Sequence, residues 1–140
     1  MKKYKYLFTF CLVIMLSFIY PVSTIAQVYS YRTTEFAYKE VNSYGNWTNW
    51  SNWEPSNIPM TIDFGNDLVV IYSNTKQIYK ITEHVRNYTD NSGGTQMEFM
   101  FIDQDGDRGT IRLRIERNGN SQVYIEFSNI MWVYNVRKVY

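Results

Sequence analysis

Cysteine is almost missing from this 140-residue chain, and Cys11 is the only one. It lies in an N-terminal apolar stretch that has the features of a removable signal, so the mature domain has no cysteine pair for a disulfide. A cysteine-based zinc site is excluded for the same reason. The domain must therefore be stabilised by its hydrophobic core alone, although we expect it to be exported.

An excess of charge of either sign is also missing. The chain has 14 Lys and Arg against 13 Asp and Glu, a net charge of +1. Loss of Lys2, Lys3 and Lys5 with the signal leaves 11 basic and 13 acidic residues, a net charge of −2. No basic run remains after the signal. This balance argues against nucleic acid and anionic membranes as partners.

Residues 1–26 have the layout of a secretory signal. Three lysines precede an apolar run over Leu7–Ile19, and Thr24-Ile25-Ala26 is a small-x-small cleavage signal. The run is shorter than the roughly 20 residues that a membrane-spanning helix needs. We therefore expect cleavage before Gln27, no stable membrane anchor, and a secreted or periplasmic protein. The short lysine-rich signal and the Asn, Ile, Tyr and Lys bias indicate a bacterial source.

Helical periodicity of useful length is absent after residue 26, and short β-forming stretches separated by turn residues take its place. We predict one all-β domain over residues 27–140, a small antiparallel meander barrel or sandwich of about eight short strands. The barrel is favoured because short turns join sequential strands. The last strand, with Trp132, Tyr134 and Val136 on one face, is expected to close or cap the sheet. The predicted strands are 28–40, 60–64, 68–73, 77–83, 97–102, 111–116, 123–127 and 129–140, with a polar loop at 87–95.

Odd-numbered positions form one apolar face on three consecutive strands, from Met97 to Phe127. Keeping this face together predicts that Phe101 pairs with Ile111 and that Ile115 pairs with Val123 across a three-residue loop at Asn118–Asn120. The opposite face would then carry two cross-strand rows of complementary side chains. These rows are Glu98–Arg114–Tyr124 and Met100–Arg112–Glu126.

The most distinctive stretch is Asn46–Trp53, N-W-T-N-W-S-N-W, which places Trp47, Trp50 and Trp53 at strict three-residue spacing. The Asn, Thr and Ser residues between the rings disfavour a helix, because their side chains compete for backbone groups. We predict an extended, irregular strand that presents a row of indoles. The rings are either covered by the protein's own strands and arginines, or open for stacking on a sugar or on a partner's apolar groups.

This stretch resembles the W-x-x-W-x-x-W strand of thrombospondin type 1 repeats, where tryptophans stack with arginines from a neighbouring strand. Arg112 and Arg114, in I-R-L-R-I, are similar to that partner strand. The resemblance covers only these two short stretches, and those repeats are held by disulfides that the mature chain here cannot form. It implies stacking of Arg112 and Arg114 with the indoles, as an analogy and not as family membership.

One acidic stretch has the composition of a metal site. Asp103, Asp105 and Asp107 stand at alternate positions around Gly106, as hard oxygen ligands do in a calcium loop. The glycine is fourth rather than sixth, however, and the twelfth residue is Arg114 instead of glutamate. We therefore favour an acidic hairpin turn at Asp105-Gly106 and expect no cofactor, with calcium as the alternative.

Signatures of catalysis are missing too. His84 is the only histidine, and the chain has no nucleophile elbow, phosphate loop, dinucleotide fingerprint or metal-protease helix. Sequons at Asn46, Asn49 and Asn87 would matter only in a eukaryotic secretory pathway. We therefore do not expect an enzyme.

We expect an exported, non-catalytic β-domain that binds a protein or glycan through a surface rich in Trp and Tyr. One alternative is a lipocalin-like carrier of a small apolar ligand inside the barrel. Another is a secreted enzyme inhibitor that inserts the loop at 87–95 into a target cleft. The sequence leaves the ligand and the oligomeric state open. The candidate binding residues are Tyr44, Trp47, Trp50, Trp53, Arg112, Arg114 and Tyr124.

Overall fold

The computed structural model describes residues 27–118 and 120–139, and the predicted signal, residues 1–26, lies outside them. Every regular element in the described part is a strand, and it contains no helix long and apolar enough to cross a membrane. The strands are β1 (Val28–Glu40), β2 (Glu54–Pro55), β3 (Pro59–Asp63), β4 (Leu68–Ile71), β5 (Gln77–Thr89), β6 (Thr95–Asp103), β7 (Arg108–Ile115), β8 (Ser121–Glu126) and β9 (Ile130–Val139).

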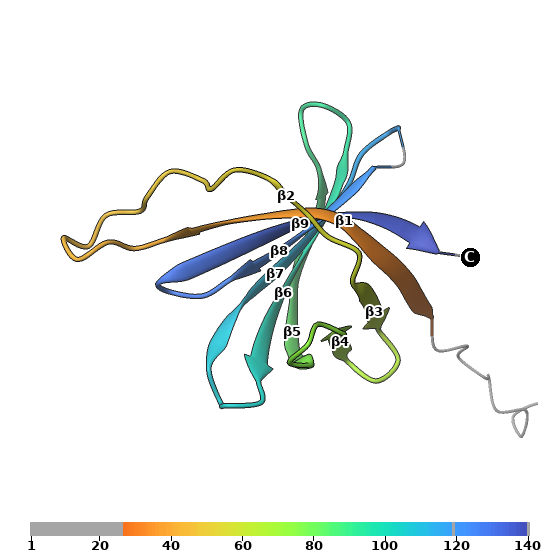
Figure 1. Cartoon of the computed structure of the whole chain (residues 1–140). Helices are drawn as coiled ribbons and strands as arrows, with labels where there is room; N and C mark the ends of the chain where they lie inside the picture. The colour runs from red at the N-terminus through yellow and green to blue at the C-terminus, as the bar shows by residue number, and fades with distance from the viewer. Residues whose placement is uncertain (1–26, 119, 140) are drawn as a thin grey trace, which may run out of the picture.

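Eight of these strands close into an antiparallel barrel (Figure 1). From β3 to β9 each strand pairs with the next along the chain, and β9 returns to pair with β1 from Ser30 to Glu40. Closure satisfies the backbone groups that an open sheet would leave at its edges. The predicted meander barrel is therefore confirmed, as is the prediction that the last strand closes the sheet.

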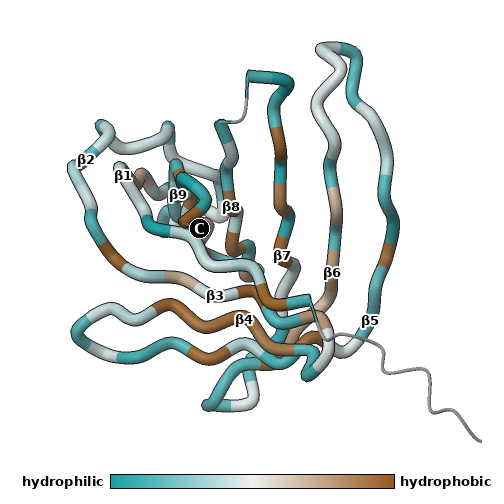
Figure 2. Tube along the Cα trace, turned by 90° about the vertical axis from the view of Figure 1, so that its right-hand side faces the viewer, coloured by the Kyte–Doolittle hydropathy of each residue, from teal (hydrophilic) through white to brown (hydrophobic). Residues whose placement is uncertain are grey.

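Apolar side chains fill the barrel. The odd-numbered face predicted for β6, β7 and β8 points inward, and Phe99, Ile111 and Val123 are all buried. The rings of Tyr79 and Phe127 each contact that of Phe101 edge to face, at 4.8 and 5.2 Å. Figure 2 shows apolar residues where the strands cross the barrel and hydrophilic residues at the hairpin tips.

The registers of two hairpins differ from the prediction by two residues. Leu113 pairs with Val123 rather than with Ile125, and Phe101 pairs with Gly109 rather than with Ile111. A shift of two residues keeps the same face inside, so the alternation of apolar residues does not detect it. Gly109 gives a physical reason for the observed register. A Cβ at Gly109 would lie 2.6 Å from the Phe101 ring and would collide with the backbone oxygen of Glu126.

The turns that set these registers are centred one residue earlier than predicted. The Asp103 carboxylate accepts hydrogen bonds from the backbone N–H groups of Asp105 and Asp107, both at 2.9 Å. In the next hairpin the Asn118 side-chain oxygen accepts one from the N–H of Asn120, also at 2.9 Å. In both turns a short polar side chain accepts the backbone N–H of the residue two positions later, which stabilises the turn.

The polar rows on the outer face change accordingly. Arg112, not Arg114, lies opposite Glu98, and Arg112 also lies opposite Tyr124. Arg112 still forms an ion pair with Glu126, which lies diagonally across the strands, at 2.9 Å. The observed rows are Glu98–Arg112–Tyr124, Gln96–Arg114–Gln122 and Met100–Thr110–Glu126.

Strand β5 is longer than the sequence indicated. It continues to Thr89, and its last three residues pair with the start of β6. The predicted loop at 87–95 is therefore restricted to residues 90–94. Because β4 has only four residues, the β5–β6 hairpin projects beyond it (Figure 2). An inhibitory loop, if the protein used one here, would be correspondingly short.

Candidate functional site

The Trp segment, residues 46–53, lies beside the second half of β1. Strand β3 pairs only with Val28–Arg32, so the rest of that side of β1 is left open. The chain turns back at Asn42–Gly45 and runs along this open side until β2. The second half of β1 and the Trp segment together form the arm that projects at the left of Figure 1. The predicted extended, irregular conformation is confirmed.

The Trp segment runs along β1 in a repeating register, in which each three residues of the Trp segment lie opposite two residues of β1. The backbone N–H of Thr48 donates to the oxygen of Glu40, and that of Ser51 donates to the oxygen of Tyr38, both at 2.8 Å. In return the Thr48 hydroxyl accepts the N–H of Glu40 at 3.1 Å, and the Ser51 hydroxyl accepts that of Tyr38 at 3.0 Å. The next step of the register is the β2 pair of Glu54 with Phe36.

Each hydroxyl thus replaces a carbonyl oxygen that a regular strand would have offered to β1. The residue after Trp47 and the residue after Trp50 are committed to this role, which explains why Thr and Ser stand at those positions. Two residues of β1 span roughly 7 Å, so successive indoles are set about that far apart along the arm.

The three rings of Trp47, Trp50 and Trp53, the Trp row, are half-exposed to similar degrees, 43%, 41% and 45%. The Lys39 ammonium lies 5.2 Å from the Trp47 ring and 4.9 Å from the Trp50 ring. The Trp50 ring meets that of Tyr124 edge to face at 6.4 Å. The rings therefore lie toward the outer face of the barrel and are neither sealed in nor free of contacts.

Two small residues make room for Trp50. To reach Tyr124 on β8, the indole must cross β1 and β9, where Ala37 lies opposite Val133. Both belong to the outer face, yet only 1% of Ala37 and 2% of Val133 is exposed. The Trp50 and Tyr124 rings, which meet at an interplanar angle of 68°, lie on the same side of the sheet as this pair and help to cover it.

Arginine stacks on tyrosine here, not on tryptophan. The Arg112 guanidinium lies 3.9 Å from the centroid of the Tyr124 ring, and the cation beside the indoles is Lys39. The predicted direct stacking of Arg112 and Arg114 with the indoles is therefore wrong. We define the outer aromatic face as Lys39, Trp47, Trp50, Trp53, Arg112 and Tyr124. Tyr44 projects from the tip of the arm, 87% exposed.

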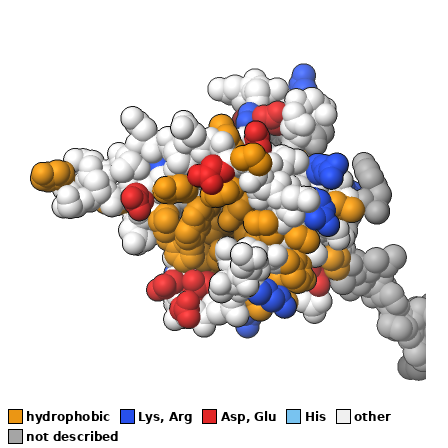
Figure 3. Space-filling view, in the orientation of Figure 1, with side chains coloured by type: hydrophobic (Ala, Val, Ile, Leu, Met, Phe, Trp, Pro, Cys, Tyr) orange, Lys and Arg blue, Asp and Glu red, His pale blue; other side chains and the backbone are white. Residues whose placement is uncertain are grey.

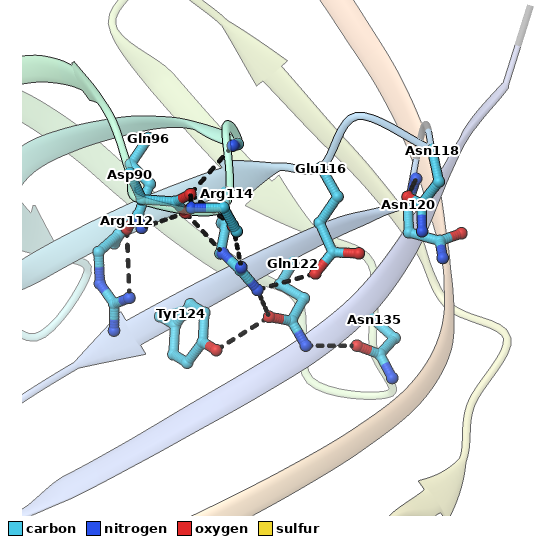
Figure 4. A network of polar contacts seen from close by, with 12 residues as sticks. Asp90, Gln96, Arg112, Arg114, Glu116, Asn118, Asn120, Gln122, Tyr124 and Asn135 are labelled. Carbon is cyan, nitrogen blue, oxygen red and sulfur yellow. Dashed lines mark hydrogen bonds and ion pairs between the residues drawn. The ribbon is translucent and has the colours of Figure 1, made fainter.

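Arg114 belongs to a polar network that adjoins the outer aromatic face through Tyr124 and Arg112 (Figure 4). It donates to the carboxylates of Asp90 at 3.2 Å and Glu116 at 2.8 Å. Beside it, the Gln122 oxygen accepts from the Tyr124 hydroxyl at 3.0 Å. This network connects the β5–β6 hairpin to β7 and β8. These bonds give Arg114 a structural role in the network.

Asp90 is the central acceptor of this network. Hydrogen bonds, first from the Ser92 hydroxyl and then from the Gln96 amide, hold the pKa of its carboxyl below the ordinary value of 3.8. The backbone N–H of Gly94 and the side chain of Arg114 act in the same direction. The carboxylate form is therefore the one that stabilises the loop at 90–94.

Asp90→Asn tests this linkage. A depressed folded-state pKa gives a stabilisation that is present above the unfolded pKa of about 4 and is lost as the pH falls below it. The melting temperature of the variant should therefore be lower at neutral pH, and the gap to the wild type should narrow between about pH 5 and pH 2. Asp105→Asn is the control, because no hydrogen bond between described residues uses its carboxylate. A gap that stayed constant with pH would contradict the linkage.

The acidic turn does not gather metal ligands. The carboxylate of Asp103 is occupied by the N–H groups of Asp105 and Asp107. Among residues 27–118 and 120–139, no three His, Cys, Asp or Glu side chains are placed to hold one metal ion. The hairpin-turn interpretation accounts for these residues.

A second surface lies at the mouth of the barrel, below the projecting arm. Figure 3 shows a broad apolar patch between the arm and the β6–β7 hairpin, with acidic side chains at its margin. Next to β1 is a hollow of about 660 Å³ in which every lining residue is uncharged. The hollow is lined by Phe36, Pro55, Ser56, Asn57, Ile58, Pro59, Tyr72, Ser73, Asn74, Thr75 and Gln77.

Three residues of the site were not among the predicted binding residues: Lys39, Ala37 and Val133. The alternation of side chains on the predicted strands was visible in the sequence, but the strand that lies beside the Trp segment was not. Pairing the T-x-x-S spacing of Thr48 and Ser51 with β1 would have placed Lys39 beside the rings. Comparisons with protein-family models, with curated proteins and with solved structures found no match to this chain.

Proposed function

We propose that this protein is an exported, non-catalytic domain that binds a protein or glycan partner through its outer aromatic face. The observation that carries the proposal is the Trp row. Its three indoles are held at regular spacing by hydrogen bonds to β1, yet each leaves more than two fifths of its surface exposed. Pre-positioned aromatic side chains lose little entropy on binding and supply large contact areas.

The charged groups around the rings support binding rather than catalysis. Glu126 is the ion-pair partner of Arg112 at 2.9 Å, and Glu98 is that of Arg86 at 2.7 Å. Lys39 is held between two indoles. These charges orient aromatic rings and each other.

Trp50→Ala tests the proposal. Trp50 is the middle ring, so its removal should weaken binding to a partner isolated by affinity capture or glycan screening by at least tenfold. Loss of its contact with Ala37 and Val133 should lower the melting temperature only slightly, because the indole is already half-exposed. Tyr72→Ala is the matched control, since Tyr72 is 45% exposed on the other surface and should not affect the same partner.

Quenching of tryptophan fluorescence gives an independent readout. In a Trp132→Phe background only the Trp row reports, and acrylamide should quench it readily while a bound partner protects it. Equal loss of binding in Trp50→Ala and Tyr72→Ala would contradict a site on the outer aromatic face. Unfolding of Trp50→Ala would show that the row is part of the structure only.

A small-ligand carrier is the second candidate, favoured by the uncharged hollow at the barrel mouth. The barrel interior itself is filled by side chains such as Phe99, Phe101 and Met60, so the ligand would lie in the hollow. In this case a small molecule should co-purify with the wild type and with Trp50→Ala, and be lost from Tyr72→Ala. Mass spectrometry of an organic extract is the measurement, and an empty extract from all three proteins would count against a carrier.

A further inference from the structure

We propose that the Trp row is a linear array of repeated subsites for an extended chain of neutral sugars, with one Asn–Trp pair in each subsite. This inference rests on the proposed function and names the class of its ligand. It is carried by three observations: the repeat of the scaffold, the uncommitted amides of the asparagines that precede the tryptophans, and the local charge.

The scaffold repeats in space as well as in sequence. Thr48 and Ser51 make the same pair of hydrogen bonds to Glu40 and Tyr38, one repeat apart. The three indoles that they carry differ by only four percentage points in exposure, from 41% to 45%. Equivalent platforms at equal steps fit a ligand that also repeats, because each unit can then make the same contact.

Each tryptophan of the row is preceded by an asparagine whose amide the fold does not use. Asn46, Asn49 and Asn52 immediately precede the three tryptophans and are exposed. No hydrogen bond between described residues uses their side-chain amides, whereas the hydroxyls of Thr48 and Ser51 are occupied by β1. An amide offers two donors and one acceptor, which matches the hydroxyl groups of a sugar.

The chemistry of the surface selects a neutral ligand. The face of an indole is the negative side of its quadrupole and attracts the C–H groups on the flat side of a sugar ring. Lys39 is the one cation over these rings in the described chain, and exposed Glu40 and Glu54 flank them. A strand of nucleic acid would also stack on indoles, but its backbone needs a groove of positive charge.

The geometry also disfavours a proline-rich peptide. Such ligands insert into clefts between aromatic side chains. The Lys39 ammonium lies 5.2 Å from the Trp47 ring and 4.9 Å from the Trp50 ring, so it occupies the space between them that such a peptide would need. What remains exposed is the outer surface of each indole, which suits stacking of sugar rings.

Titration calorimetry of the mature protein with neutral oligosaccharides tests the array. The probes are β-1,4-linked glucose and N-acetylglucosamine oligomers, each as a disaccharide, a tetrasaccharide and a hexasaccharide, with a proline-rich peptide for comparison. Affinity for the preferred series should rise with length, by roughly two- to tenfold for each further ring engaged. It should change little when the salt concentration is raised, because no ion pair forms.

Two variants separate the array from a single sugar site. Trp53→Ala removes one of the three subsites, at one end, so it should reduce the gain from disaccharide to tetrasaccharide and leave disaccharide binding nearly intact. Asn49→Ala keeps every ring and every internal hydrogen bond, so it should weaken binding several-fold with an unchanged melting temperature. Tyr72→Ala should bind every oligomer as the wild type does.

The outcomes distinguish this inference from the proposed function. Affinity that does not depend on length, or exclusive binding of the peptide, would overturn the array while Trp50→Ala still reported binding on the outer aromatic face. Failure of every neutral oligosaccharide to bind would also overturn it. If a partner binds but ignores Trp50→Ala, the proposed function itself fails.

Discussion

Replacement of Gly109 by alanine is expected to prevent folding or to lower the free energy of unfolding by about 3 kcal/mol or more, at the upper end of the cost of overpacking a core. Gly109 lies opposite Phe101, and a Cβ there would lie 2.6 Å from the Phe101 ring. It would also collide with the backbone oxygen of Glu126, which belongs to β8. A ring can rotate away, but this oxygen moves only if the pairing of β7 with β8 is disturbed.

Urea unfolding followed by tryptophan fluorescence measures this effect. Thr110→Ala is the control, because Thr110 is the next residue of β7 and lies on the outer face, so its loss should cost less than about 1 kcal/mol. The experiment also decides the register. Had Phe101 paired with Ile111, Gly109 would stand near the strand end opposite Asp103, where alanine is tolerated. A folded Gly109→Ala protein of nearly native stability would therefore contradict the observed register.

The double replacement Thr48→Val and Ser51→Ala is expected to release the Trp row from β1. It removes the two hydroxyls that accept the backbone N–H groups of Glu40 and Tyr38. Each lost hydrogen bond costs about 1 kcal/mol at most, because water can replace it at this exposed edge. Partner binding should nevertheless fall at least tenfold, since the rings lose the fixed spacing that pre-organises them.

Hydrogen exchange reports on the scaffold without any partner. The amide hydrogens of Tyr38 and Glu40 should exchange much faster in the double variant than in the wild type. Thr48→Ser is the matched control, because it keeps the hydroxyl and should keep both the slow exchange and the binding. Slow exchange in the double variant would show that the three-against-two register does not depend on the hydroxyls.

The alternation of apolar residues predicted more of the fold than of the site. It placed Phe99, Leu113 and Ile125 inside, and all three are buried. It could not choose between registers that differ by two residues, because both bury the same face. The choice depends on the contact of Gly109 with Phe101 and on the turn that Asp103 stabilises, which are specific packing and hydrogen-bond effects.

The structure brings some of the predicted binding residues together and places Arg114 elsewhere. Trp47, Trp50, Arg112 and Tyr124 are joined by successive ring and cation contacts through Lys39. Arg114 lies in the polar network around Asp90 instead. The analogy of arginines stacked with indoles identified the right kind of interaction but assigned it to the wrong cation. A correct assignment required the strand order β1–β9–β8, which brings Tyr124 within reach of Trp50.

By itself the sequence determined that this chain forms an all-β domain without disulfides, which residues face its core, and that the Trp segment is extended. These properties follow from side-chain type and a period of two, which act locally along the chain. Only the tertiary structure decided the registers, the position of the Trp segment beside β1, and the pairing of Lys39 with the indoles. Those depend on contacts between residues far apart in sequence, where shape and hydrogen-bond geometry select one arrangement among several that bury the same residues.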